Sequence, residues 1–381
     1  MVGTNKNRIY ALLAVIVILM IAIIGVNRIY SNKKIRIGVV LPLTGELSNF
    51  GRAVRNGVQM SVDDFNINNN INVYVKFEDS QAKPAMAVSA LLKLIDYDKV
   101  DIVIGSLTSS ETLAMVPIAN KRKILLISPT ASNPKLSNSS PYFYRVWPSD
   151  TFDGMIAAKY SYTKFGARKV AIIYINNDYG LGLKNKYNDI FRLMGGKVIS
   201  IDSYLENASD FRTLLIKIKQ NKPDLIYLPG HPRSIGMILK QSRELNMNFK
   251  FISNVAAEDK EFINVAGSAA NGLIFTSPTY SVNSRENNDF VNKYTKKYTQ
   301  EPDVHAVKGY EAAAILLEAI KKGNSSADDI RKYINSKKSF NMISGKLTFD
   351  KNGDIECPIS VKRYDENGLI KVVEVFIEKQ K

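Results

Sequence analysis

The sequence predicts an α/β protein with two doubly wound lobes, and three observations support this fold class. Short aliphatic runs recur along the chain, as is typical of parallel strands covered on both faces. Helical patterns lie between these runs. After a proline in RVWPSD (145–150) the same alternation starts again. The length of 381 residues suffices for two cores, since single cores usually stop growing well before this size.

Nine runs are predicted to be strands, at 35–41, 72–79, 100–105, 123–128, 169–175, 197–204, 224–229, 249–253 and 272–278. The clearest helices are expected at 53–65, 85–95 and 304–322. Pro84 stands where the second helix begins, a position at which its missing N–H costs nothing. Gly323 follows two lysines at the end of the third helix, which is a common C-terminal signal.

The N-terminal segment 9–26 is uncharged and apolar on every face. As a helix it would span roughly 27 Å, close to the hydrocarbon core of a bilayer. Lys6 and Arg8 precede it, as in an export signal, but no clear small-residue cleavage site follows. We predict an uncleaved single-pass anchor in the cell membrane, with a cleaved signal peptide as the alternative. Residues 1–8 would be a tail, 27–34 a linker, and the remaining body extracytoplasmic.

Composition and motifs exclude several classes of function. The net charge is +16, but the basic residues are scattered, which favours a solvated surface over nucleic-acid binding. The single cysteine, Cys357, excludes an internal disulfide and a thiolate metal cluster. We find no phosphate-binding loop, dinucleotide fingerprint, zinc-protease motif or serine-hydrolase elbow, so neither an enzyme nor a cofactor or metal is predicted. Segment 350–361 begins like a calcium loop but lacks its glycine and final glutamate, so a polar hairpin turn is expected.

Small polar residues follow four of the predicted strands, where ligands of α/β sheets bind. Thr108-x-x-Glu111 has capping-box spacing, which would place Ser109 and Ser110 in the first turn of a helix. The free N–H groups and the dipole of such a turn suit a carboxylate. The other loops of this kind are 129–134, 176–180 and 230–232.

These residues carry a family resemblance that covers 35–381. The matching segments include VIGSLTSSET, ISPTASNP, INNDYGLG, LPGHPRSIG, GYEAAAILLEAI and GKLTFDKNGDI. The body resembles the periplasmic leucine/isoleucine/valine-binding proteins, the type I solute-binding proteins of branched-chain amino-acid ABC transporters. The resemblance implies two lobes that close on a small ligand, chain crossings near 147, 278 and 346, and an ABC permease as partner. Lobe 1 would comprise 35–146 plus 279–345, and lobe 2 would comprise 147–278 plus 346–381.

The resemblance also implies site residues. Ser109 and Ser132 would hold the ligand carboxylate, while the Thr130 carbonyl and the Ser132 hydroxyl would accept from its ammonium group. Phe50 would pack on the ligand, and Tyr179 would close over it from the second lobe. The full predicted set is Phe50, Leu107, Thr108, Ser109, Thr130, Ala131, Ser132, Tyr179, Gly230, His231 and Val255. His305 falls in a stretch where the family often places a ring.

One departure concerns the charge of the ligand. Amino-acid binders of the family carry an acid in the loop after the strand at 249–253, and this chain has Val255 there. A buried ammonium group without a counter-charge is costly. Either Glu258 or Asp259 reaches in, or the ligand is an amide or another solute that is not an α-amino acid. The leading interpretation is a tethered binding protein that delivers a small carboxylate-bearing solute, in particular an amino acid, to the permease. A tethered ligand sensor is the alternative.

Overall fold

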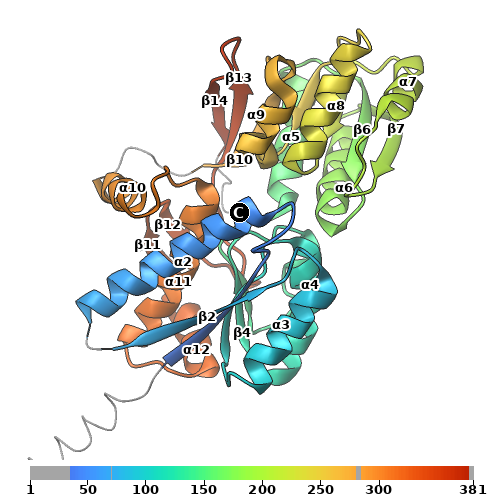
Figure 1. Ribbon diagram of the computed structural model, residues 1–381. Coiled ribbons are helices and arrows are strands. Elements are labelled where there is room, and N and C mark those ends of the chain that lie inside the picture. Colours follow the sequence, from blue (N-terminus) through green and yellow to red (C-terminus); the bar gives the residue numbers. More distant parts are fainter. Residues whose placement is uncertain (1–34, 70, 280–284, 377–381) are drawn as a thin grey trace, which may run out of the picture.

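The computed structural model describes residues 35–69, 71–279 and 285–376, which form two α/β lobes (Figure 1). The first lobe is built on a parallel sheet with the strand order β2-β1-β3-β4-β5. Its strands are β1 (Ile35–Leu41), β2 (Val73–Asp79), β3 (Ile102–Gly105), β4 (Leu125–Ser128) and β5 (Phe143–Arg145). Three of these strands have every residue buried, as expected of a sheet covered on both faces.

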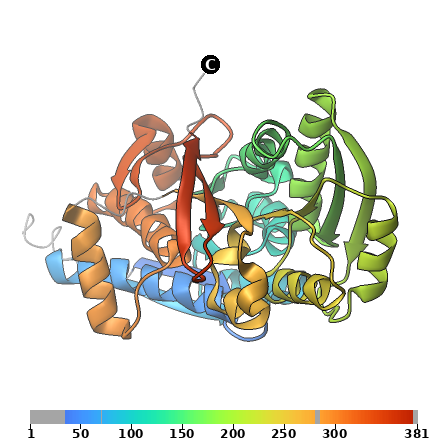
Figure 2. The ribbon, with the colours of Figure 1, turned by 90° about the horizontal axis from the view of Figure 1, so that it is seen from above.

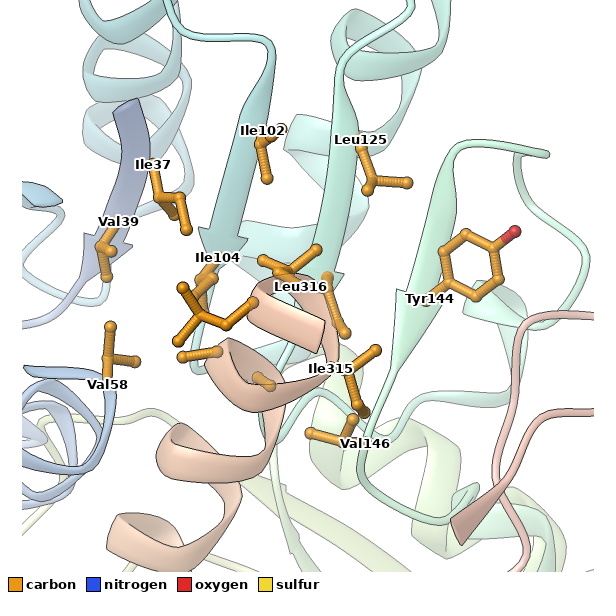
Figure 3. Close-up of a cluster of buried hydrophobic side chains, with 14 of the residues drawn as sticks. Ile37, Val39, Val58, Ile102, Ile104, Leu125, Tyr144, Val146, Ile315 and Leu316 are labelled. Atoms are coloured by element: carbon orange, nitrogen blue, oxygen red, sulfur yellow. The ribbon is translucent and has the colours of Figure 1, made fainter. Parts of the chain in front are cut away.

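Helices cover both faces of this sheet. One face packs against α2 (Ser48–Asn68), α11 (Val304–Lys321) and α12 (Ala327–Lys337). Figure 3 shows this core, in which Leu316 of α11 lies next to the strand residue Ile104 and Ile315 lies next to Val146. The other face packs against α3 (Pro84–Asp96) and α4 (Ser109–Arg122). Helices α2 and α11 approach so closely that a Cβ on Gly57 would lie 2.0 Å from the Ala306 carbonyl oxygen.

The second lobe has a seven-stranded sheet with the order β14-β13-β10-β9-β8-β6-β7. The strands are β6 (Lys169–Ile175), β7 (Lys197–Tyr204), β8 (Leu225–Leu228), β9 (Phe251–Ser253), β10 (Ile274–Pro278), β13 (Ile359–Tyr364) and β14 (Ile370–Phe376). Strands β6 to β10 run parallel, whereas β13 and β14 form an antiparallel hairpin at the edge opposite β7 (Figure 2). One face packs on α5 (Asp150–Thr163) and α6 (Asp178–Leu193), and the other on α7 (Arg212–Gln220), α8 (Pro232–Glu244) and α9 (Lys260–Ala266).

The remaining elements join the lobes or extend the first one. Helix α10 (Arg285–Tyr298) packs through Phe290 and Tyr294 on the first lobe. The small hairpin of β11 (Ser339–Met342) and β12 (Gly345–Thr348) does the same through its buried face. Short 3-10 turns lie at η1 (Pro134–Leu136), η2 (Val255–Glu258) and η3 (Gly267–Ala270).

The third crossing, predicted near residue 346, lies further along the chain. Leu347, Phe349, Ile355 and Cys357 all lie in the core of the first lobe. The chain joins the second sheet only at Ile359, where β13 begins. The apolar side chains of 347–357 therefore complete the first lobe, and the crossing follows them.

The predicted hairpin turn at 350–354 is confirmed. The Asp350 carboxylate accepts hydrogen bonds from the backbone N–H groups of Asn352 and Asp354. Phe349 and Ile355, on either side of the turn, form an isolated antiparallel β-bridge. The predicted anchor at 9–26 lies outside the described residues. Within the described part of the chain, no helix is both long and apolar enough to cross a bilayer.

Candidate functional site

A cavity of about 710 Å³ lies between the lobes. Its lining includes Phe50, Leu107, Thr108, Ser109, Thr130, Ser132, Tyr179, Gly230, His231 and Val255, all of which the sequence analysis names. Ala131 does not line it. The Ala131 side chain is 1% exposed and packs in the first-lobe core with Val103 and Leu126.

The N-terminus of α4 forms part of the first-lobe wall. The predicted capping box is confirmed: the Thr108 hydroxyl accepts from the Glu111 N–H, and the Glu111 carboxylate accepts from the Thr108 N–H. Helix α4 begins at Ser109, so the first-turn N–H groups at Ser109 and Ser110 have no acceptor within the helix. Both residues line the cavity. This end of the helix suits an anion.

The loop 129–134 lies beside this helix end. The Ser109 hydroxyl oxygen accepts from the backbone N–H groups of Ser132, at 3.4 Å, and Asn133, at 3.2 Å. The Thr130 hydroxyl donates to the Leu107 carbonyl at 2.7 Å. These bonds tie the two strand-end loops into one surface, so Ser109, Thr130 and Ser132 share a wall.

A buried arginine holds the same loop from behind. The Arg145 guanidinium is fully buried and donates to the Asp354 carboxylate (2.7 Å), the Ser137 hydroxyl (2.8 Å) and the Asn133 carbonyl (3.0 Å). Because the guanidinium presents several donors in a fixed plane, it fixes both the loop and the 350–354 turn.

The second-lobe wall is organised by Asn254, which follows β9 and is fully buried. Its side-chain amide donates to the Tyr179 hydroxyl (2.5 Å) and the Gly230 carbonyl (3.1 Å) and accepts from the Gly230 N–H (3.3 Å). Sequence reasoning missed Asn254. Its position after a buried strand is the signal that could have identified it.

Three rings form a stacked row on the cavity wall. The ring centroids of Phe50 and His305 lie 4.2 Å apart, and those of His305 and Trp147 lie 5.6 Å apart. All three line the cavity. The sequence analysis had noted His305 as a ring position but had missed Trp147. On the second lobe, burial lowers the pKa of His231 to about 4, so this imidazole is neutral at physiological pH.

Neither acid expected to supply a counter-charge enters the cavity. The Glu258 carboxylate pairs with the Lys362 ammonium at 2.5 Å, and the Asp259 carboxylate caps α9 by accepting from the Glu261 N–H. The carboxylates that line the cavity are those of Glu46, Asp178 and Glu206. Of these, Glu46 and Glu206 are exposed.

The lobes touch each other beside the cavity. The Asn133 amide of the first lobe donates to the Asp178 carbonyl of the second at 2.5 Å. The Asp178 N–H donates to the Ser110 hydroxyl at 3.3 Å. Trp147 of the first crossing, Val255 of the second lobe and Val304 of the first form a small apolar cluster. Within the described residues, no group of three metal-ligating side chains is found.

Comparisons with known proteins agree with this architecture. The Leu/Ile/Val-binding protein of Escherichia coli K12 is 29% identical over 330 residues, which are 84% of this chain and 88% of that protein. The Leu/Ile/Val-binding protein BraC3 of Rhizobium johnstonii is 27% identical over 327 residues, with 84% and 89% coverage.

Two solved structures match closely. The leucine-binding protein LivK of Thermotoga maritima is 29% identical with a TM-score of 0.83, covering 90% of this chain and 99% of that one. The branched-chain amino-acid substrate-binding protein LivJ of Streptococcus pneumoniae, solved with isoleucine, is 26% identical with a TM-score of 0.83, covering 91% and 100%. A sequence profile described as "Periplasmic binding protein" matches residues 34–368. The chain therefore belongs to the periplasmic binding protein family.

Proposed function

We propose that this protein is the extracytoplasmic solute-binding component of an ABC transporter, which captures a small carboxylate-bearing solute and delivers it to a membrane permease. The observation that carries the proposal is the cavity between the lobes, where the N-terminus of α4 and the Ser109 hydroxyl face Tyr179 across the cleft. Because a solute there contacts both lobes only when they are closed, it shifts the population toward the closed form.

The relatives guide the choice of ligand. The similar proteins from Escherichia coli and Rhizobium johnstonii bear the name Leu/Ile/Val-binding protein, and the Streptococcus pneumoniae structure contains isoleucine. We propose a branched-chain or similarly apolar amino acid as the first candidate. The apolar wall of Phe50, Trp147 and Val255 suits its side chain, and the α4 terminus suits its carboxylate.

We further propose that segment 9–26 tethers the body to the outer face of the cell membrane. Its uncharged apolar length is close to the hydrocarbon thickness of a bilayer. The family's periplasmic role agrees with a body on that side. Protease treatment of intact spheroplasts tests the proposal with two forms of the protein, one with the native segment and one in which a cleavable export signal replaces it. Both bodies should reach the outer side of the membrane, but only the body with the native segment should stay on the membranes and be cleaved there. Release of the native form from the membranes would contradict the tether.

A thermal-shift screen of the full chain in mild detergent tests the binding function. The panel comprises amino acids, amides and short carboxylic acids. A ligand at 100 times its dissociation constant should add about 2.7 kcal/mol of stability. Ser89→Ala, which changes an exposed serine on α3, is the control variant and should show the same ligand-induced rise in melting temperature as the wild type. If no member of the panel stabilises the protein, the proposed function is wrong.

A further inference from the structure

Strand β14 is the outer strand of the second sheet, and β13 is its one strand partner within the described residues. Figure 1 shows the hairpin of these two strands at the edge of the second lobe, beside α9. An edge strand presents unpaired backbone N–H and C=O groups, and proteins usually protect such an edge with charges, with a very short strand or with a covering element. Strand β14 is seven residues long, so its free edge is large enough to pair with another strand.

The side chains at this edge are unusually apolar for an exposed strand. Leu369, Ile370, Val372, Val373 and Val375 are each between 40% and 60% exposed. They are five of the thirteen large apolar side chains that are exposed in the described part of the chain, and they lie within seven consecutive residues. Exposed apolar side chains are normal when they are scattered, whereas a group of neighbouring ones marks an interaction surface.

The sequence of this edge is complementary to itself. Segment 369–376 reads LIKVVEVF, in which Lys371 and Glu374 stand at equal distances from the centre between Val372 and Val373. When two copies pair antiparallel about this centre, Lys371 of each copy lies opposite Glu374 of the other, and every other facing pair is apolar. Opposite charges in facing positions stabilise an antiparallel pair of strands, and like charges destabilise it.

Both charged side chains are accessible to a second copy. The Lys371 side chain is 64% exposed and the Glu374 side chain is 35% exposed. Each has an ion-pair partner in its own chain: Lys371 pairs with Asp365 at 3.0 Å, and Glu374 pairs with Lys164 at 3.4 Å. Ion pairs at such exposed sites contribute little to stability, so exchanging them for pairs between two copies costs little.

One irregularity limits the length of the pairing. Val373 has no partner on β13, because the register of the hairpin shifts at this residue. A bulge of this kind bends the strand, which shortens the stretch that a second strand can follow. The contact is therefore expected to be smaller than the interface of a stable dimer, and the association weak.

We propose that β14 is a self-association edge, at which two copies of this chain pair antiparallel about Val372 and Val373 and join their second sheets. This inference goes beyond the proposed function and does not depend on it. None of the residues 369–376 lines the cavity. Each copy therefore keeps its own ligand site, and the two chains are linked through their second lobes.

Sedimentation equilibrium of the full chain in density-matched mild detergent measures the association. We expect a reversible monomer–dimer equilibrium with a dissociation constant of about 100 µM, in the range of small interfaces. A wild-type chain that stays monomeric up to about 1 mM overturns the proposal and leaves the edge to a different occupant, such as the permease.

Reversing either charge of the edge tests the register. Lys371→Glu and Glu374→Lys should each weaken the dimer about 10-fold or more, because like charges then face each other at two positions. The first substitution lowers the net charge of +16 by two and the second raises it by two, so an effect of overall charge would have opposite signs in the two variants.

Two combinations should restore the association of the wild type. The double variant Lys371→Glu with Glu374→Lys keeps the net charge and again places opposite charges in facing positions. An equimolar mixture of the two single variants should form mixed dimers, because all the charges that face each other in a mixed pair are opposite. This rescue separates pairing between copies from an effect within one chain.

Lys197→Glu is the matched control. It reverses an exposed lysine on β7, the strand at the opposite edge of the same sheet, and should leave the association unchanged. Since Lys197, Lys371 and Glu374 lie outside the cavity, solute binding should stay at the wild-type level in every variant.

Two results contradict the paired edge. Unchanged association in both single variants would show that the copies meet through another surface. Failure of both the double variant and the mixture to restore the dimer would show that Lys371 and Glu374 do not face each other. Neither result affects solute binding, so the failure of this inference is distinguishable from the failure of the proposed function.

Discussion

The Asn254 side-chain amide donates to the Tyr179 hydroxyl over 2.5 Å and so joins two second-lobe residues that are 75 positions apart. Tyr179 stands at the start of α6, and Asn254 follows β9. The same amide holds Gly230 through two backbone hydrogen bonds. A single fully buried side chain therefore holds Tyr179 and Gly230 in the second-lobe wall of the cavity.

Asn254→Ala should lower the free energy of unfolding by about 1–3 kcal/mol, because buried partners at Gly230 and Tyr179 are left unsatisfied. Ligand affinity should fall with it, since the Tyr179 ring is no longer held. Urea denaturation and calorimetry measure the two effects. In a double-mutant cycle with Tyr179→Phe, the coupling energy should be about 0.5 kcal/mol or more. A coupling of zero would contradict the link.

Ser109→Ala should weaken ligand binding by roughly ten- to a hundredfold, which corresponds to about 1.5–3 kcal/mol for a hydrogen bond to a charged group. The variant also loses the acceptor for the Ser132 and Asn133 N–H groups, so its melting temperature has to be measured beside its affinity. Affinity equal to that of wild type in calorimetry would remove Ser109 from the site.

Much of the fold follows from local sequence patterns. The predicted strands at 35–41, 169–175 and 197–204 coincide with β1, β6 and β7. They are apolar runs bounded by charged or turn residues, a pattern that depends on neighbours in the chain alone. The C-terminal hairpin was missed although β14 is also an apolar run that follows a turn. Most of its residues are exposed, and its pairing with β13 rather than a covering layer of helices defines it.

The parts of the site that the sequence predicted correctly are those whose signal spans only a few neighbouring residues. The capping box at Thr108 and Glu111 is a four-residue pattern and is confirmed. The counter-charge of the ligand was expected to depend on Val255, Glu258 and Asp259. The Glu258 carboxylate, however, forms an ion pair with Lys362, which lies 104 positions later in the chain. Ion pairs between residues so far apart in the sequence are set by tertiary packing, and no local motif predicts them.

Asn133→Asp should shift the unliganded protein toward an open form. The aspartate keeps the oxygen that accepts from the Lys135 N–H, but it replaces the amide that donates to the Asp178 carbonyl across the lobes. Two acceptors would then face each other. Small-angle scattering should give a larger radius of gyration than wild type without ligand. Asn246→Asp, in the turn after α8, is the control and should leave the radius unchanged. An unchanged radius in Asn133→Asp would contradict the role of this contact.

Asp153 should make stability depend on pH. Burial raises the pKa of Asp153 to about 6, against a hydrogen bond from Thr276 that lowers it. The unfolded chain has a pKa of about 3.9, so the folded protein binds this proton more tightly. The burial penalty is therefore absent below about pH 4, grows as the pH rises from 4 to 6, and is complete above 6.

Asp153→Asn cannot ionise and should be more stable than wild type at pH 7.5 by up to about 3 kcal/mol, at 1.36 kcal/mol per pKa unit. The advantage should vanish at pH 4. Urea denaturation at both values checks this, with the exposed Asp189→Asn as control. A constant difference across the range would show that the carboxyl does not titrate as described.

Arg145→Met should destabilise the protein by about 3–5 kcal/mol, because it leaves the Asp354 carboxylate and the carbonyls of the 129–134 loop without their buried donor. Lysine carries the charge but not the planar set of donors, so Arg145→Lys should recover only part of the loss. The matched control is Arg122→Met, whose pair with Asp96 is about half exposed on both sides and should be worth less than about 1 kcal/mol. Urea denaturation compares the three variants.

Since Arg145 holds the loop that carries Ser132, ligand affinity should fall in Arg145→Met and stay unchanged in Arg122→Met. Equal stability of the two methionine variants would mean that the buried guanidinium does not hold the site together.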